Sequence, residues 1–295
     1  MARRLALLSL ILDHPLNRRH RVRALARWFA WQGWKVIVRR PITIKFWREL
    51  RVRVYPDWPY SWTAIYLGLT EYDDMMFTLR YLRPGDTFVD VGANIGFYSF
   101  LAASVNGAAP VLAYEPHPTA SERLRENIAI NSFDNVRVRQ VAVGDIPDEG
   151  RLSTDLMDQN RLESTHESFQ NSVVVPIVTL DADLTEQGVD LATIRLVKID
   201  TEGFEAKVIA GAQSLLDADP GPVWLVELTW LGRRYGSDAA AMHRFFTDRG
   251  YRALRYLAAE NRLFPYDGPD PEHENVIFAR QPDQLALRLE SALAG

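Results

Sequence analysis

The sequence predicts an α/β protein built on a mostly parallel β-sheet with helices on both faces. Three observations support this fold class. Short apolar strands alternate with helical segments from residue 88 onward, a glycine-rich turn follows the first of these strands, and the last two strands have no helix between them. Alternating strands and helices form a parallel sheet that is covered on both faces. The two final strands must then pair antiparallel, because no helix lies between them to make a parallel crossover.

An N-terminal extension, residues 1–66, precedes this pattern and is expected to pack on the main domain. Residues 18–34 have apolar side chains at helical spacing and arginines elsewhere, which predicts a basic amphipathic helix. The predicted apolar face consists of Val22, Leu25, Ala26 and Phe29. Alternating apolar residues predict short strands that include 36–38 and 52–55. Six of the eight tryptophans lie in this extension: Trp28, Trp31, Trp34, Trp47, Trp58 and Trp62.

The main domain is expected over residues 67–280, followed by a C-terminal helix within 281–295. The predicted strands are 88–91, 111–114, 136–143, 194–199, 223–228, 251–257 and 275–279. The predicted helices are 71–82, 97–105, 119–131 with a Thr119–Glu122 capping box, 204–216, and 238–249 with Ser237 as N-cap. Residues 144–172 are too long and too polar for a simple connection, so a hairpin or lid is expected there.

The glycine-rich turn reads Asp90-Val-Gly92-Ala-Asn94-Ile-Gly96 and lies between a strand and a helix. Such a turn lets the backbone approach a ligand and presents unpaired N–H groups to it. Glu115 ends the next strand, where a carboxylate can accept both hydrogen bonds of a ribose diol. Asn94 occupies a position where a pyrophosphate would require glycine. The turn therefore favours a nucleoside cofactor without a pyrophosphate, namely S-adenosylmethionine, and the alternative is a purely structural turn.

Seven blocks of sequence follow one another between about residues 65 and 280: FVDVGANIGFYSF, YEPHP, ENIAIN, AVGD, VPIVTLDADL, VKIDTEGFEAKVIAGA and VELT. In this order they resemble the FkbM-type S-adenosylmethionine-dependent methyltransferases. The resemblance implies the class I methyltransferase (Rossmann-like) fold, a seven-stranded, mostly parallel sheet with an antiparallel last strand. It also implies methylation of a hydroxyl on a sugar, a glycoconjugate or a polyketide-like metabolite. Residues 150–172 match the family only loosely, which leaves the lid and its selectivity open.

The same resemblance implies a set of cofactor-binding residues. The methionine part is held by Asp90, Gly92, Asn94 and Gly96, with Asp200 close by. The ribose is held by Glu115, and the adenine is flanked by the segment from Ala142 to Asp145.

Acidic residues at two strand ends are the candidate catalytic groups. Asp200 and Glu202 follow the fourth strand and Glu227 ends the fifth, at the sheet edge where ligands of α/β proteins bind. An alcohol must lose its proton during methylation, and a carboxylate within hydrogen-bond reach can accept it, so Asp200 is the candidate base. His273 is an alternative base, whereas Glu205 is expected to cap the following helix. The same carboxylates could hold a hard cation, but we favour a metal-independent site.

The clustered tryptophans have three interpretations. They form a core between the extension and the main domain, or they form a wall of the acceptor site, or they help a basic helix to lie on an anionic membrane. For the second interpretation, Trp58 and Trp62 are the candidate acceptor contacts, because aromatic faces stack on sugar rings.

Charge and composition limit the partners and the location. Residues 1–53 carry 14 Lys or Arg against two acidic residues, a net charge of +12, whereas the remainder carries −16. The acidic body argues against a nucleic-acid partner. The chain has no cysteine and no apolar run long enough to cross a bilayer, so a soluble, cytoplasmic protein is expected. A non-catalytic binding protein of the same fold is the alternative function, and the oligomeric state stays open.

Overall fold

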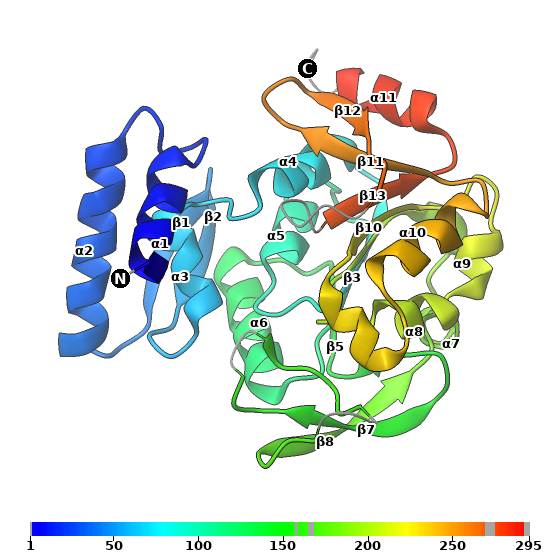
Figure 1. The fold of residues 1–295 in the computed structure, drawn as a ribbon, viewed down its shortest axis with the longest axis horizontal. Coiled ribbons are helices and arrows are strands. Elements are labelled where there is room, and N and C mark those ends of the chain that lie inside the picture. The colour runs from blue at the N-terminus through cyan, green and yellow to red at the C-terminus, as the bar shows by residue number, and fades with distance from the viewer. Residues whose placement is uncertain (1, 157–158, 165–167, 269–274, 292–295) are drawn as a thin grey trace.

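The computed structural model describes residues 2–156, 159–164, 168–268 and 275–291. Within these residues, the largest element is a mixed sheet of eight strands in the order β12-β11-β13-β10-β9-β3-β4-β5 (Figure 1). The strands are β3 (Thr87–Val91), β4 (Val111–Tyr114), β5 (Val136–Arg139), β9 (Ile194–Ile199), β10 (Val223–Glu227), β11 (Arg252–Leu257), β12 (Arg262–Pro265) and β13 (Asn275–Ala279).

The pairing of the strands confirms the α/β class and corrects the number of strands. The five strands from β5 to β10 run parallel, and β13 lies antiparallel between β10 and β11, as the final hairpin required. The prediction of seven strands is wrong, because β12 adds an antiparallel edge to β11. A turn after Leu257 sends the chain back to make this edge, and Asn261 in that turn has a φ of +49°, which asparagine tolerates.

The predicted strand 136–143 is two strands in two sheets. β5 ends at Arg139, and β6 (Ala142–Val143) joins a separate sheet of order β6-β8-β7. In that sheet β7 (Asp148–Ser153) and β8 (Ser172–Val178) pair antiparallel, with Ser153 opposite Ser172. A hairpin or lid was expected within residues 144–172; β7 and β8 pair there, and the second strand extends to Val178.

The helices of the main domain are α4 (Tyr72–Tyr81), α5 (Phe97–Ala103), α6 (Pro118–Asn131), α7 (Leu180–Glu186), α8 (Glu205–Ala210), α9 (Gln213–Asp217), α10 (Ala239–Thr247) and α11 (Pro282–Ser291). The predicted helix 204–216 is interrupted at Gly211, where a Cβ would lie 2.0 Å from the carbonyl oxygen of Gly144. The two predicted N-cap residues, Thr119 and Ser237, are wrong, because the residue that caps each helix lies earlier or later in the chain. His117 caps α6, because Pro118 takes the first helical position, and Asp238 caps α10 with a hydrogen bond to the amide of Ala241.

Six strands of the sheet contribute to two cores because neighbouring side chains point to opposite faces: β3, β4, β9, β10, β11 and β13. Phe88 and Leu225 belong to the core beneath α4, α5 and α6. Val89 and Trp224 belong to the core beneath α7, α8, α9 and α10. The predicted central strands therefore consist of continuous apolar runs, as strands buried on both faces must.

The N-terminal extension forms a layer beside the main domain (Figure 1). Its elements are α1 (Ala2–Asp13), α2 (Arg21–Ile37), β1 (Ile42–Trp47), β2 (Leu50–Val54) and α3 (Pro59–Tyr66). The strand predicted at 36–38 is wrong, because the helix continues through Ile37 and the strand that pairs with β2 is β1. The apolar face predicted for the helix is also wrong as a packing face. Ala24 and Trp31 are buried instead, because the tryptophans of the other face bury more apolar area.

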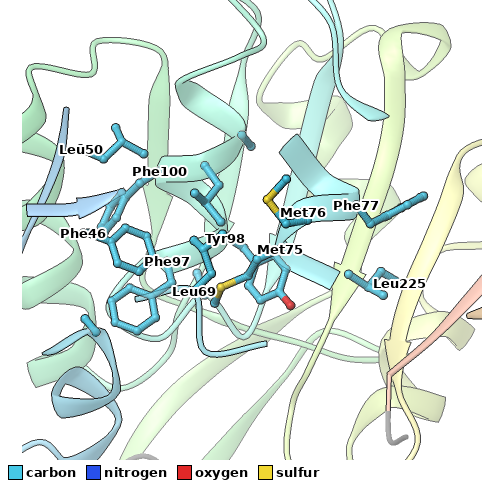
Figure 2. Close-up of a cluster of buried hydrophobic side chains, with 14 of the residues drawn as sticks. Phe46, Leu50, Leu69, Met75, Met76, Phe77, Phe97, Tyr98, Phe100 and Leu225 are labelled. Carbon is cyan, nitrogen blue, oxygen red and sulfur yellow. The ribbon is translucent and has the colours of Figure 1, made fainter. Parts of the chain in front are cut away.

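The extension shares a core with one face of the main sheet. The ring of Phe46 from β1 stacks on the ring of Phe97 from α5 with centroids 4.8 Å apart, and Leu50 lies close by (Figure 2). Backbone groups at the edge of β2 form hydrogen bonds with side chains of α6. Asn127 Oδ1 accepts the amide of Arg53 at 2.7 Å, so a backbone donor of this short strand is paired across the two layers.

Candidate active site

A cleft with a cavity of about 190 Å³ opens at the carboxyl ends of β3, β4, β9 and β10. This edge holds the point where strand order reverses, between β3 and β9, which is where open α/β sheets bind ligands. The predicted residues that line the cleft are Asp90, Gly92, Asn94, Glu115, Ala142, Asp200, Glu202, Glu227 and Trp58. The fold thus brings side chains from distant parts of the chain into one cavity.

The glycine-rich turn is built by close approach of two backbones. Gly92 has a φ of +83°, and a Cβ on it would lie 1.7 Å from the carbonyl oxygen of Asp200. Asn94 has a φ of +52°, a left-handed conformation that asparagine adopts more readily than most residues. Gly96, with a φ of +98°, is the N-cap of α5, and a Cβ there would meet Leu124 at 2.3 Å. Gly92 and Gly96 are therefore required by space as well as by backbone conformation, while Asn94 remains beside the cavity.

Glu115 follows the neighbouring strand β4 and holds the glycine-rich turn by accepting a hydrogen bond from its backbone. Its Oε2 accepts the amide of Asn94 and its Oε1 accepts the amide of His117, both at 2.8 Å. Burial raises the pKa of Glu115 to about 7, against the opposing effect of these two amides and with a further contribution from Asp90 and Asp200. Each carboxylate oxygen has a second lone pair, so Glu115 can still accept two hydrogen bonds from a ligand.

Asp90 lies at the floor of the cleft and is 1% exposed. Its Oδ2 accepts the hydroxyl of Ser99 at 2.6 Å, whereas its Oδ1 is buried and has no protein partner in the described structure. Burial raises the pKa of Asp90, and the neighbouring cation Lys198 opposes that effect. A buried acceptor without a partner is costly, so this oxygen is suited to a donor that a ligand supplies.

Lys198 also lines the cleft, and it is not among the site residues predicted from the sequence. Its Nζ donates to Asp200 Oδ2 at 2.8 Å, and its side chain is 3% exposed. Burial lowers the pKa of Lys198, but Asp200, Glu71 and Asp90 together raise it well above the usual range. A signal was present, because a lysine inside the apolar strand IRLVKI must be paired when that strand is buried.

The three acidic residues after Asp200 differ in their surroundings. Glu205 is buried in the first turn of α8 and accepts the amides of Thr201 and Gly203, so it holds the turn before the helix, whereas it was expected to cap the helix itself. Glu202 lines the cleft and has a φ of +55°. Glu227 Oε2 is buried without a protein partner in the described structure. Burial raises the pKa of Glu227 well above the ordinary carboxyl range, and Asp200, Glu202 and Glu205 add to this effect.

The two predicted acceptor tryptophans lie in different places. Trp58 lines the cleft, where its Nε1 donates to Asn94 Oδ1 at 2.9 Å. Trp62 does not line the cleft. Its Nε1 donates to the carbonyl of Tyr55, and its ring lies against Trp31 within the extension. The core interpretation of the cluster therefore fits Trp62 and Trp31, while Trp58 joins the site.

The hairpin segment covers one side of the cleft. Leu152 of β7 and residues 159–162 line the cavity. The carbonyl of Leu162 accepts the hydroxyl of Tyr235 at 2.5 Å, which ties this segment to the 3₁₀ helix Trp230–Tyr235 that follows β10. Ala142 lines the cavity as predicted, but Asp145 does not, because its carboxylate pairs with Lys207 at 2.6 Å outside it.

Three further predictions concern His273, a bound metal ion and a membrane-spanning segment. His273 lies outside the described residues. Among the described residues, no group of three or more His, Asp or Glu side chains is arranged to hold a metal ion, so Asp200, Glu202 and Glu227 do not form such a set. No helix in the described ranges is both long and apolar enough to cross a membrane.

Comparisons relate this chain to known proteins. A family model described as the methyltransferase FkbM domain matches residues 90–253, more than half of the chain. The chain is 32% identical over 173 residues to the 31-O-demethyl-FK506 methyltransferase FkbM of Streptomyces tacrolimicus, covering 47% of this chain and 62% of that protein. It is 28% identical over 152 residues to the 2-O-methyltransferase NoeI of Sinorhizobium fredii, covering 45% and 60%. The matched region thus spans about three fifths of these relatives.

Two solved structures are also similar. The methyltransferase FkbM from Methylobacillus flagellatus has 14% identity and a TM-score of 0.41, covering 74% of this chain and 54% of that chain. A methyltransferase from Streptococcus mutans in complex with SAH has 11% identity and a TM-score of 0.42, covering 70% of this chain and 94% of that chain.

Proposed function

The chain belongs to the FkbM methyltransferase family, and on that premise we propose that it transfers a methyl group from S-adenosylmethionine to a hydroxyl of a sugar, glycoconjugate or polyketide-like acceptor. One observation carries the proposal. The cleft joins a glycine-rich turn closed by Glu115 to an ion pair of Asp200 and Lys198. The names of the two curated relatives, both O-methyltransferases, support a hydroxyl acceptor.

The residues of the turn fit this cofactor. Glu115 has two acceptor positions left for a ribose diol, and the buried Oδ1 of Asp90 has none of its capacity used by protein donors in the described structure. Gly92 keeps the turn free of side chains next to Asp200, and Ala142 leaves room on the side assigned to the adenine. When bound, S-adenosylmethionine supplies a methyl group that is activated by its sulfonium charge.

We assign the proton of the acceptor hydroxyl to Asp200. Its Oδ2 is held by Lys198, which leaves Oδ1 to accept the proton while the acceptor oxygen is aligned. Lys198 is a positioning residue, because it fixes the orientation of the carboxylate. Burial raises the pKa of Glu227 well above the ordinary carboxyl range, which favours a protonated carboxyl that would donate a hydrogen bond to a second oxygen of the acceptor. Most of the acceleration then comes from alignment of the reacting groups.

Calorimetric titration of the full chain with S-adenosylhomocysteine tests the cofactor, and NAD is the matched control. We expect S-adenosylhomocysteine to bind and NAD to leave the heat signal unchanged. Transfer of a labelled methyl group to a set of monosaccharides and hydroxylated macrolides then tests the acceptor. Equal binding of both nucleotides would contradict the cofactor, and labelling of amines in preference to hydroxyls would contradict the acceptor.

A further inference from the structure

Helix α2 has a second apolar face that is open to solvent. Val22, Phe29 and Val36 are seven residues apart and therefore lie in one line along the helix. Their side chains are 83%, 64% and 61% exposed, and that of Ile37, the last residue of the helix, is 82% exposed. Single exposed apolar residues are ordinary on a protein surface, but a continuous line of them marks an interaction site.

The opposite side of α2 packs against the rest of the extension. Ala24 and Trp31 are buried there, and the ring of Trp31 meets the ring of Trp62 from α3 with centroids 6.4 Å apart. Arg27 from the same helix donates to Asn17 Oδ1 at 2.7 Å. These contacts fix the rotation of α2, so its exposed line cannot turn inward.

The charges around the exposed line are predominantly basic, although Asp13 pairs with Arg21 at its start. The sequence of α2 contains four basic residues and no acidic residue. Arg19, Arg23, Arg39 and Arg40 are exposed near the line. The complementary partner is therefore anionic and presents an apolar layer next to its charges.

We propose that α2 docks on a lipid bilayer that contains anionic headgroups, with Val22, Phe29 and Val36 entering the boundary of the acyl chains. A basic helix with one exposed apolar face lies in the plane of such an interface. Its arginines then meet the lipid phosphates, because the negative surface potential attracts basic segments. A second copy of this chain is a poorer occupant, since it would bring together two segments that each carry a net charge of +12.

The position of α2 allows docking without closing the cleft. The helix forms the outer side of the extension, on the far side of α1, α3 and β1 from the main sheet (Figure 1). No described residue of α2 lines the cleft. Membrane docking is therefore independent of the proposed methyl transfer and can be tested without the acceptor.

Co-sedimentation of the full chain with vesicles tests the proposal. We compare vesicles of phosphatidylcholine alone with vesicles that also contain phosphatidylserine. The unsubstituted chain should bind the anionic vesicles at least roughly tenfold more tightly, and added salt should weaken that binding. The double substitution Phe29→Ser with Val36→Ser should lower binding by about tenfold or more. Leu287→Ser on α11, which also replaces a side chain that is 65% exposed, is the matched control and should bind as the unsubstituted chain does.

A second variant keeps the test independent of folding. Arg19→Gln with Arg23→Gln alters two exposed side chains of the polar rim and should also weaken binding to anionic vesicles, while circular dichroism stays unchanged. No binding to either vesicle, or equal binding by all variants, would overturn the proposal. A dimer in light scattering that Phe29→Ser with Val36→Ser converts to a monomer would assign the face to a second copy, and would overturn it too.

Discussion

The indole nitrogen of Trp58 donates a 2.9 Å hydrogen bond to the side-chain oxygen of Asn94 across the boundary between the extension and the glycine-rich turn. Trp58 is the N-cap residue of α3, and Asn94 has a left-handed backbone conformation. The amide of the same Asn94 is held by Glu115. A residue of the extension therefore helps to set the conformation of the turn proposed to hold the methionine part of the cofactor.

Replacing Trp58 by Phe should weaken binding of S-adenosylhomocysteine by roughly fivefold to tenfold, since a hydrogen bond contributes about 1 kcal/mol. The ring stays in place, so the melting temperature of the free protein should change little. Isothermal titration calorimetry measures the affinity. The matched control is Trp62→Phe, which loses a hydrogen bond to Tyr55 outside the cleft and should leave the affinity unchanged. An equal loss of affinity in both variants would show that the bond to Asn94 is not the cause.

Glu115 should make cofactor binding depend on pH. Its pKa in the folded protein is raised from the ordinary value of 4.5 to about 7. The ionised form accepts two hydrogen bonds from a diol, so the affinity for S-adenosylhomocysteine should fall as the pH falls through about 7. In Glu115→Gln, the affinity should be lower and this pH dependence should be lost. Calorimetry on both sides of neutrality tests this, and an unchanged pH profile in the variant would exclude Glu115.

The same raised pKa predicts an opposite trend for the stability of the free protein. Between pH 4.5 and about 7 the folded state binds a proton at Glu115 that the unfolded state has released. The stabilisation from this residue is therefore complete below pH 4.5 and is lost as the pH rises through about 7. Urea unfolding of the unsubstituted chain and of Glu115→Gln should show the difference as a smaller pH slope in the variant.

Variants of Asp200 and of Lys198 should distinguish the contribution of proton transfer from that of aligning the reacting groups. Asp200→Asn should lower kcat by roughly a hundredfold or more, with little change in cofactor affinity, because it removes the proposed general base. Lys198→Met should lower kcat less while raising the acceptor's KM, and Lys198→Arg should restore part of the loss, because a cation again orients the carboxylate. Steady-state kinetics measure both effects. Full activity in Asp200→Asn would show that another group accepts the proton.

Gly92→Ala should prevent stable folding of the cofactor edge. The added Cβ would lie 1.7 Å from a backbone oxygen of Asp200, and neither chain segment can move without breaking the pairing of β3 with β9. We expect a loss of more than about 3 kcal/mol in the free energy of unfolding. Gly85→Ala is the control, because Gly85 has a φ of +95° but no neighbouring atom within 4 Å. It should lose only about 1 kcal/mol, the cost of the left-handed backbone.

Sequence patterns predicted the central sheet well because they depend on burial of both faces. β4 and β9 have the predicted bounds, since their apolar runs are interrupted by turn residues on either side. Edge elements were harder to predict. β12 has few buried side chains and a short loop before it, so no apolar alternation marked it. The direction in which α2 faces the protein could not be predicted either, because its sequence has two apolar faces and only tertiary packing selects one.

Some residues of the candidate site could be predicted from the sequence, and others could not. Asp90, Glu115, Asp200 and Glu227 stand at strand ends, so parallel topology alone brings them to one edge. Trp58 and Trp62 look equivalent in the sequence, four residues apart before the main domain. Their separation depends on the helix α3, where Trp58 is the N-cap and Trp62 lies in the first turns facing Trp31. Lys198 went unnoticed because lysine is normally a surface residue.

The stacking of Phe46 on Phe97 bears on how the protein would respond to protease and heat. A boundary near residue 66 divides the chain by composition, but a cut there would uncover an apolar layer on both products. Digestion at this point should yield insoluble fragments instead of a trimmed, folded protein. Heating should melt the extension and the sheet together in one cooperative transition, since neither keeps a complete interior without the other. Truncated versions for crystallisation or engineering would therefore have to retain the first 66 residues.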